Sequence, residues 1–259
     1  MKKTIVFLAV SAMFLCRVSA DELEDAVKFH VPFEDSCDAV VSEGAEKGDP
    51  AGNPIFVDGV YGKAIRSGSG GSAIRFMREE NLDFDNPGTV NVWFKIDCEH
   101  GTQGPAIPFW GVGADPQKGI LTVGVLNDPM KLCPCRRQIG FLFISKKRPK
   151  YAKAYSVNSG ARRICSGWHL MSTAWYGSKL FVSLDGSPYR SFELEKPLSN
   201  EELGYQKRFG VGWSYDRWSF ELDEFTIYGK KLSDAEIEKI YEDGMKKIEG
   251  EKKDVKTEK

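Results

Sequence analysis

Residues 209–237 read FGVGWSYDRWSFELDEFTIYGKKLSDAEI, and this stretch decides the predicted fold. The part at 220–228 is rich in β-branched and aromatic residues, which predicts a strand that ends at Gly229. Ser233 with Glu236 three residues later is the capping-box pattern typical of a helix start. We therefore expect the chain to end with a strand followed by a short helix.

Upstream of this stretch, short apolar segments alternate with Gly, Pro, Asn and Asp, and no segment between 25 and 228 keeps a helical period. Strands at this spacing predict a sandwich or jelly roll. In the segment 89–96, alternate residues Val90, Val92, Phe94 and Ile96 are apolar and should share one buried face. The strands are expected at 27–33, 73–76, 89–96, 120–126, 139–144, 168–175, 180–184, 209–213 and 220–228.

The order of several segments resembles the LamG-like domains of the concanavalin A-like superfamily. The resemblance covers most of 27–241 and implies an all-β jelly-roll sandwich of two antiparallel sheets with a short C-terminal helix. Two regions depart from the family pattern, a Gly/Pro-rich segment at 99–119, expected to be a long loop, and a cysteine-bearing insertion at 127–138. The matching segments are VKFHVPFEDS at 27–36, VYGKAI at 60–65, GTVNVWFK at 88–95, GWHL at 167–170, TAW at 173–175, KLFVSLDG at 179–186, FGVG at 209–212, and 223–237.

The N-terminus has the pattern of a secretory signal peptide at 1–20, with two lysines, an apolar run and small residues before the end. Removing it leaves 239 of the 259 residues, with 33 basic and 37 acidic side chains. This balance gives no electrostatic footprint for nucleic acid. We expect a domain at 21–243, a charged tail at 244–259 and a secreted or periplasmic location, with no transmembrane segment in the mature chain.

Removal of Cys16 would leave five cysteines, and an exported protein can keep disulfides. We expect a bridge from Cys133 or Cys135 to Cys165. A zinc site has less support, because only one residue separates Cys133 from Cys135 and the three histidines are scattered. Since the number of cysteines is odd, at least one thiol should stay free or pair between chains.

The carboxylates do not follow the pattern of a retaining glycosidase, which needs two of them about 5 Å apart. Glu221 and Asp223 begin the laminarinase-type pattern Glu-x-Asp-x-x-Glu, but Thr226 stands where the second Glu is needed. The sequence also lacks a serine nucleophile elbow, a phosphate-binding glycine loop and a metalloprotease motif. We therefore expect no catalytic residue and no polysaccharide hydrolysis. A divergent glycosidase or lyase remains the third alternative.

An aromatic loop follows the strand at 209–213 and is the best candidate binding site. Aromatic rings cover the apolar faces of sugars, while charged side chains hydrogen-bond their hydroxyls. The pattern favours a secreted, non-catalytic glycan-binding or adhesive module whose partner is a polysaccharide or glycoconjugate. A protein-interaction or structural domain is the alternative, and the two tryptophans of the loop fit a core-capping role equally well. The candidate residues are Trp213, Tyr215, Asp216, Arg217 and Trp218, with Trp110 as a second platform.

Asp223 lies between apolar residues in a strand that should pack on the core, where a carboxylate is costly unless it is paired or bound to a metal. The family resemblance implies a structural calcium ion held by Asp223 and by Glu34 and Asp35 at the end of the first strand. Calcium binds such oxygen ligands with loose geometry. The alternative is that Asp223 accepts hydrogen bonds from backbone amides or pairs with Lys or Arg, and both stay open.

Overall fold

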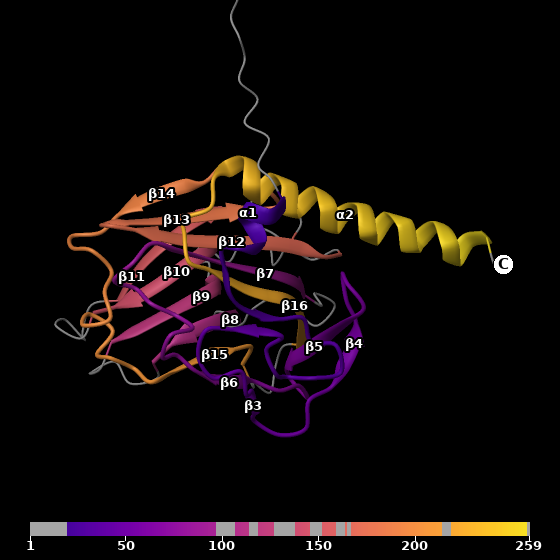
Figure 1. Cartoon of the computed structure of the whole chain (residues 1–259), viewed down its shortest axis with the longest axis horizontal. Helices are drawn as coiled ribbons and strands as arrows, with labels where there is room; N and C mark the ends of the chain where they lie inside the picture. The colour runs from indigo at the N-terminus through magenta and orange to yellow at the C-terminus, as the bar shows by residue number, and fades with distance from the viewer. Residues whose placement is uncertain are drawn as a thin grey trace, which may run out of the picture.

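The computed structural model describes residues 20–96, 107–113, 119–126, 138–145, 152–158, 164, 167–213 and 219–257. These residues form two antiparallel sheets that pack face to face, and a C-terminal helix α2 (Asp234–Thr257) lies along one of them (Figure 1). A short helix α1 (Ala20–Glu24) precedes the first strand. The predicted all-β sandwich is confirmed.

The larger sheet, sheet A, has the order β14-β13-β12-β7-β16-β1-β2 in the described residues, with β5 beside β16 and β4 beside β5. Its central strands β7 and β16 come from parts of the chain more than 100 residues apart, and α2 follows β16 directly. The strands are β1 (Val27–Val31), β2 (Val41–Ser42), β4 (Phe56–Asp58), β5 (Lys63–Gly68), β7 (Gly88–Ile96), β12 (His169–Tyr176), β13 (Lys179–Leu184), β14 (Arg190–Glu193) and β16 (Ser219–Tyr228).

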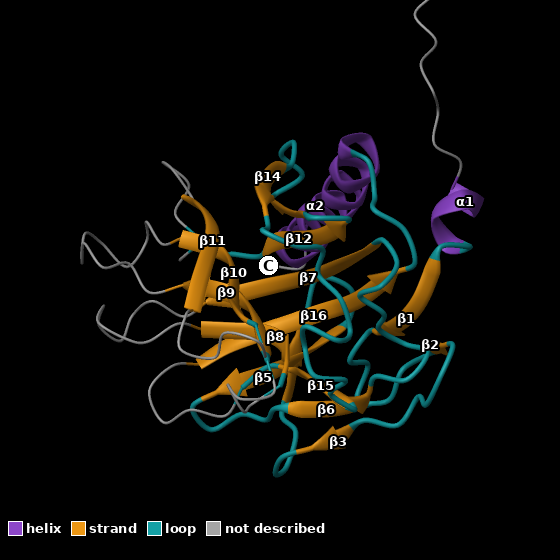
Figure 2. Cartoon of the chain, turned by 90° about the vertical axis from the view of Figure 1, so that its left-hand side faces the viewer, coloured by secondary structure: helices purple, strands orange, loops and turns teal. Residues whose placement is uncertain are grey.

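The second sheet, sheet B, has the order β11-β10-β9-β8-β15-β6-β3 (Figure 2). Its strands are β3 (Asp49–Pro50), β6 (Ile74–Met77), β8 (Ile107–Val112), β9 (Ile120–Leu126), β10 (Gln138–Ile144), β11 (Ala152–Asn158) and β15 (Arg208–Val211). Strand β8 corrects the sequence analysis, which placed 99–119 in a loop. Pro108 and Gly111 hide the strand in the sequence, and a register shift between Pro108 and Trp110 accommodates the proline.

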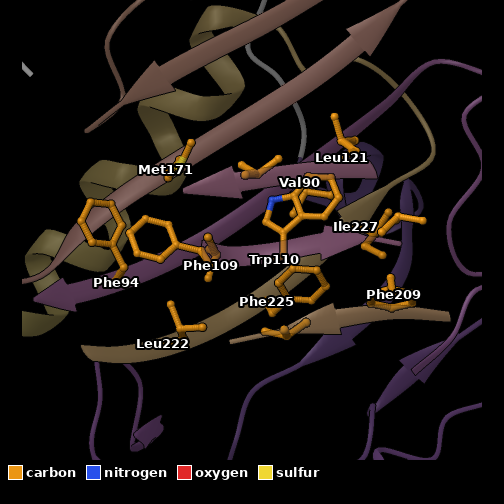
Figure 3. Close-up of a cluster of buried hydrophobic side chains, with 14 of the residues drawn as sticks. Val90, Phe94, Phe109, Trp110, Leu121, Met171, Phe209, Leu222, Phe225 and Ile227 are labelled. Carbon is orange, nitrogen blue, oxygen red and sulfur yellow. The ribbon is translucent and has the colours of Figure 1, made fainter. Parts of the chain in front are cut away.

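The core between the sheets is strongly aromatic. The face of β7 that carries Val90, Val92, Phe94 and Ile96 is buried, as predicted. Phe94 stacks on Phe109 of sheet B, with ring centroids 4.4 Å apart. Phe225 of β16 packs against Trp110 and Phe209 at the centre of the same cluster (Figure 3). Burying each such ring contributes about 2 kcal/mol, so this interface supplies a large part of the domain's stability.

The outer face of sheet A, which points away from sheet B, carries a second apolar cluster under α2. Trp93 of β7 stacks on Tyr241 of the helix at 5.8 Å, and Met245 and Ile248 pack on the same cluster. The predicted capping box is confirmed, because the Ser233 amide donates to Glu236 Oε2 at 2.6 Å. The helix itself continues to Thr257.

Gly244 is expected to be essential to this docking, although glycine is a poor helix former. A Cβ at position 244 would overlap the Trp93 ring, whereas one at Gly250 would meet nothing within 4 Å. We expect Gly244→Ala to destabilise the protein by about 1–3 kcal/mol through overpacking. Gly250→Ala should stabilise it by about 0.5–1 kcal/mol. Denaturant unfolding measures both values, and equal effects of the two substitutions would refute the close contact.

Candidate functional site

Trp213 lies just after β15, at the point where the chain passes from sheet B to sheet A. Its amide donates to Ser67 Oγ at 2.8 Å, and its carbonyl accepts from the Gly68 amide at 2.6 Å. Gly212 has a φ of 71°, and a side chain there would overlap Ser67, so the approach of the two segments requires glycine. Trp213 is 38% exposed as a residue. A partly exposed tryptophan therefore stands on a backbone that is fixed to β5.

The rest of the predicted aromatic loop, Tyr215, Asp216, Arg217 and Trp218, lies outside the described residues. Trp110 is described, and its predicted role as a second platform is wrong. It is only 1% exposed, points into the core and meets Phe225 edge to face. The reason is that 107–112 is a central strand of sheet B rather than a surface loop, so the Trp110 ring faces the core.

Asp223 has no exposed surface, and both of its carboxylate oxygens accept hydrogen bonds from backbone amides. Val60 and Tyr61 donate to Oδ2 at 2.6 and 3.2 Å, and Glu224 donates to Oδ1 at 2.9 Å. Glu34 acts on the same loop, because its Oε1 accepts from the Lys63 amide at 2.9 Å. The two carboxylates thus fix the turn between β4 and β5 from two sides.

This arrangement favours the amide alternative for Asp223 over the calcium alternative. Amide N–H groups point at the oxygen atoms of Glu34 and Asp223 that a calcium ion would need. The backbone of Asp35 is in the left-handed region, with a φ of 51°. Among the described residues, no three His, Cys, Asp or Glu side chains lie close enough together to hold a metal ion. The carboxylate oxygens of Glu34 and Asp223, which accept hydrogen bonds from these amides, do not fit a calcium site in this arrangement. Calcium binding by the protein stays a prediction.

Glu224 follows Asp223 at a register shift between β16 and β7, and its φ is 52°. The bulge allows both Asp223 and Thr226 to face outward while Phe225 stays in the core. Glu224 then reaches β1, where its Oε2 lies 2.8 Å from His30 Nε2. Asp223 and Glu224, although adjacent, therefore bind different partners.

The sequence analysis missed a row of four side chains on the outer face of sheet A, which we call the basic row: Arg66, Glu221, Lys95 and Trp168. Glu221 lies opposite Arg66 of β5 on one side and Lys95 of β7 on the other. Lys95 Nζ is 2.7 Å from Glu221 Oε2 and 5.7 Å from the centre of the Trp168 ring. Arg66, Glu221 and Lys95 become neighbours only through strand pairing, so no local motif in the sequence predicts the row.

The cysteine predictions are not settled by the structure. Cys133, Cys135 and Cys165 lie outside the described residues. Cys37 is free and buried, and burial, followed by the Asp38 charge, raises the pKa of its thiol to about 11. Such a thiol stays protonated at neutral pH and is therefore a poor nucleophile.

Comparison with known proteins identifies only structural relatives, because no family model and no curated protein matches the sequence. The binding domain of Paraclostridial Mosquitocidal Protein 1 superposes with a TM-score of 0.64 at 14% identity, covering 85% of this chain and 52% of that one. A botulinum neurotoxin type C structure gives 0.65 at 10% identity, covering 87% and 53%. The receptor-binding domain of the C/D mosaic serotype gives 0.60 at 14%, covering 84% and 51%.

What is shared is the fold. The chain spans about half the length of each of these structures, and the low identity carries no further conclusion. The neighbours support a β-sandwich but do not decide between the LamG-like family and other sandwiches. Among the described helices, none combines the length and the apolar composition that crossing a membrane requires.

Proposed function

We propose that this chain is a non-catalytic glycan-binding or adhesive module and that Trp213 forms part of its binding surface. The observation that carries the proposal is the exposed indole on a backbone held to Ser67 and Gly68. A fixed backbone lowers the entropy cost of binding, since little has to be ordered when a ligand stacks on the ring. The indole offers the flat apolar face that sugar rings need.

The structural neighbours point in the same direction. They are binding or receptor-binding domains of toxins, and cell entry of botulinum neurotoxin type C depends on interaction with two ganglioside molecules. These properties belong to those proteins, of which this chain matches about half, and they support the proposal through the shared fold alone. LamG-like kinship and export through a cleaved signal peptide are parts of the proposal that rest on the sequence pattern.

A glycan array tests the proposal. Wild-type protein should bind a defined set of glycans, and Trp213→Ala should weaken that binding about tenfold or more, because one stacked ring contributes on the order of 1–2 kcal/mol. Trp213→Phe should keep part of the affinity. Tyr176→Ala is the matched control, since Tyr176 is also an exposed aromatic residue but lies at the far end of β12. Absence of any glycan signal, or equal losses in both alanine variants, would refute the proposed function.

A further inference from the structure

The side chain of Asn91 is buried in the middle of sheet A without a hydrogen-bond partner. Only 2% of the residue is exposed, and neither its Nδ2 nor its Oδ1 bonds to any of the residues that the structure describes. Asn91 lies on the outer face of β7, between Thr89 and Trp93. Because an unpaired buried amide is costly, nearly all such groups bond to the protein or to an ordered small molecule. A bound molecule is therefore expected at this position.

Strand pairing places a polar side chain on each side of Asn91. Ser172 of β12 is its partner in one ladder, and Thr226 of β16 is its partner in the other. Paired residues share a face and have Cβ atoms about 4.5–5.5 Å apart. Ser172 and Thr226 are only 1% and 7% exposed. Ser172, Asn91 and Thr226 thus form a buried row across the outer face of sheet A, which we call the polar row.

The Tyr228 hydroxyl lies close to the polar row. Burial, followed by the charge of Glu224, raises the pKa of Tyr228, and the polar side chains of Asn91 and Thr226 oppose that rise. The hydroxyl and the Asn91 amide nevertheless do not meet the geometry of a hydrogen bond. Polar groups that lie near one another without bonding directly are often bridged by a third molecule.

Helix α2 covers the polar row and packs on an apolar cluster at each side of it. Trp93 and Tyr241 belong to one cluster, and Tyr228 and Ile237 belong to the other. Ile240 packs on both clusters, so the helix passes over the row between them. The side chains of the row are uncharged and shielded from solvent, where an ion would be costly. A neutral molecule that both donates and accepts hydrogen bonds, and that fits beneath a docked helix, is water.

We propose that the polar row binds an ordered water molecule between sheet A and α2. The water bonds to the Asn91 amide, and its other hydrogen bonds go to the side-chain oxygens of Ser172, Thr226 and Tyr228. A buried water typically makes about three hydrogen bonds to groups that would otherwise be unpaired. The interface beneath α2 then consists of two dry apolar clusters with a hydrated row between them. This inference is independent of the proposed glycan binding.

A high-resolution crystal structure of the full chain tests the inference. A water molecule is expected within about 2.7–3.2 Å of the Asn91 amide and at a similar distance from at least one side-chain oxygen of Ser172, Thr226 or Tyr228. In solution, NMR should show cross-relaxation between the side-chain amide protons of Asn91 and a long-lived bound water.

Crystal structures of three variants identify the group that holds the water. Asn91→Leu replaces the amide by an apolar side chain of similar length and should lose the water. Asn91→Ser keeps a hydroxyl and leaves more room, so it should retain the water even if Asn91→Leu folds poorly. Ser183→Ala is the matched control, because Ser183 lies beside Ser172 on the same face but donates its hydroxyl to the Ser187 carbonyl. The control should keep the water.

The inference would be overturned if the wild-type crystal structure showed no water at the polar row, whether the Asn91 amide bonded directly to protein groups or stayed unpaired. It would also fail if Asn91→Leu kept the water in the same place, because the amide would then not be the group that binds it. Neither result would affect glycan binding through Trp213, which the array tests separately.

Discussion

Replacing Trp93 with alanine is expected to destabilise the protein by about 3–5 kcal/mol, as is usual for a fully buried tryptophan. Trp93 lies at the centre of the interface between sheet A and α2, with Val60 and Leu170 beside it and Tyr241 stacked on its ring. The substitution leaves a cavity under the helix that neither the strand nor the helix can fill. The melting temperature should fall by roughly 10 °C for a domain of this size.

The loss of stability in Trp93→Ala should be largest at helix α2. In Trp93→Ala, a lysine-specific protease should cut α2 faster than in the wild type, because the helix loses its main contact with the sheet. Tyr176→Ala, an exposed aromatic residue on the same sheet, should change stability by less than about 0.5 kcal/mol. If Trp93→Ala and Tyr176→Ala had the same melting temperature, and if α2 resisted the protease in both variants, the proposed docking of the helix would be wrong.

Asp223→Ala is expected to have the second large effect, on the order of 3 kcal/mol or more, because each buried amide that loses its acceptor costs about 1–3 kcal/mol. Three amides lose their acceptor at once, those of Val60, Tyr61 and Glu224. Asp223→Asn should cost less, since its carbonyl can still accept from the first two. Denaturant unfolding of both variants measures the difference in the free energy of unfolding. If Asp223→Ala left this free energy unchanged, the turn between β4 and β5 would not depend on the Asp223 carboxylate.

The same carboxyl group predicts a pH dependence. Burial, followed by the negative charge of Glu224, raises the pKa of Asp223 from 3.8 to about 8, against the opposing effect of the amide donors. Between these two pH values the native state therefore holds a proton that the unfolded chain has released. Stability should fall as pH rises through this range, and Asp223→Asn should lose that part of the decline. Identical pH profiles for variant and wild type would contradict the assignment.

Thermal unfolding with a chelator separates the two alternatives for Asp223. If backbone amides alone satisfy the carboxylate, removing divalent cations should leave the melting temperature unchanged. A fall that added calcium restores, and that is absent in Asp223→Ala, would support the calcium site instead, because an ion bound only to the native state stabilises it by mass action.

Features that depend on local pattern could be predicted from the sequence. Alternation in 89–96 predicted the face of β7 that packs against sheet B, although the opposite face is buried as well, and the Ser233–Glu236 pair predicted where α2 begins. The apolar neighbours of Asp223 predicted that its carboxylate would be buried and need partners. The identity of those partners did not follow, because the amides of Val60 and Tyr61 lie more than 160 residues away in sequence.

Features that depend on pairing between distant strands could not be predicted. Trp110 was placed on the surface because Pro108 and Gly111 made its strand look like a loop, and only the ladder with β9 and β15 shows that it is central. The basic row depends on two strand pairings, because Arg66 becomes a neighbour of Glu221 through the register of β5 with β16, and Lys95 through the register of β7 with β16. No sequence motif determines either of these two registers.

A crystal structure of the protein with the glycan that binds most tightly on the array would test the central claim most directly. The account predicts that a sugar ring of the bound glycan lies against the indole of Trp213. A glycan bound away from Trp213, with the indole free of contact, would contradict it.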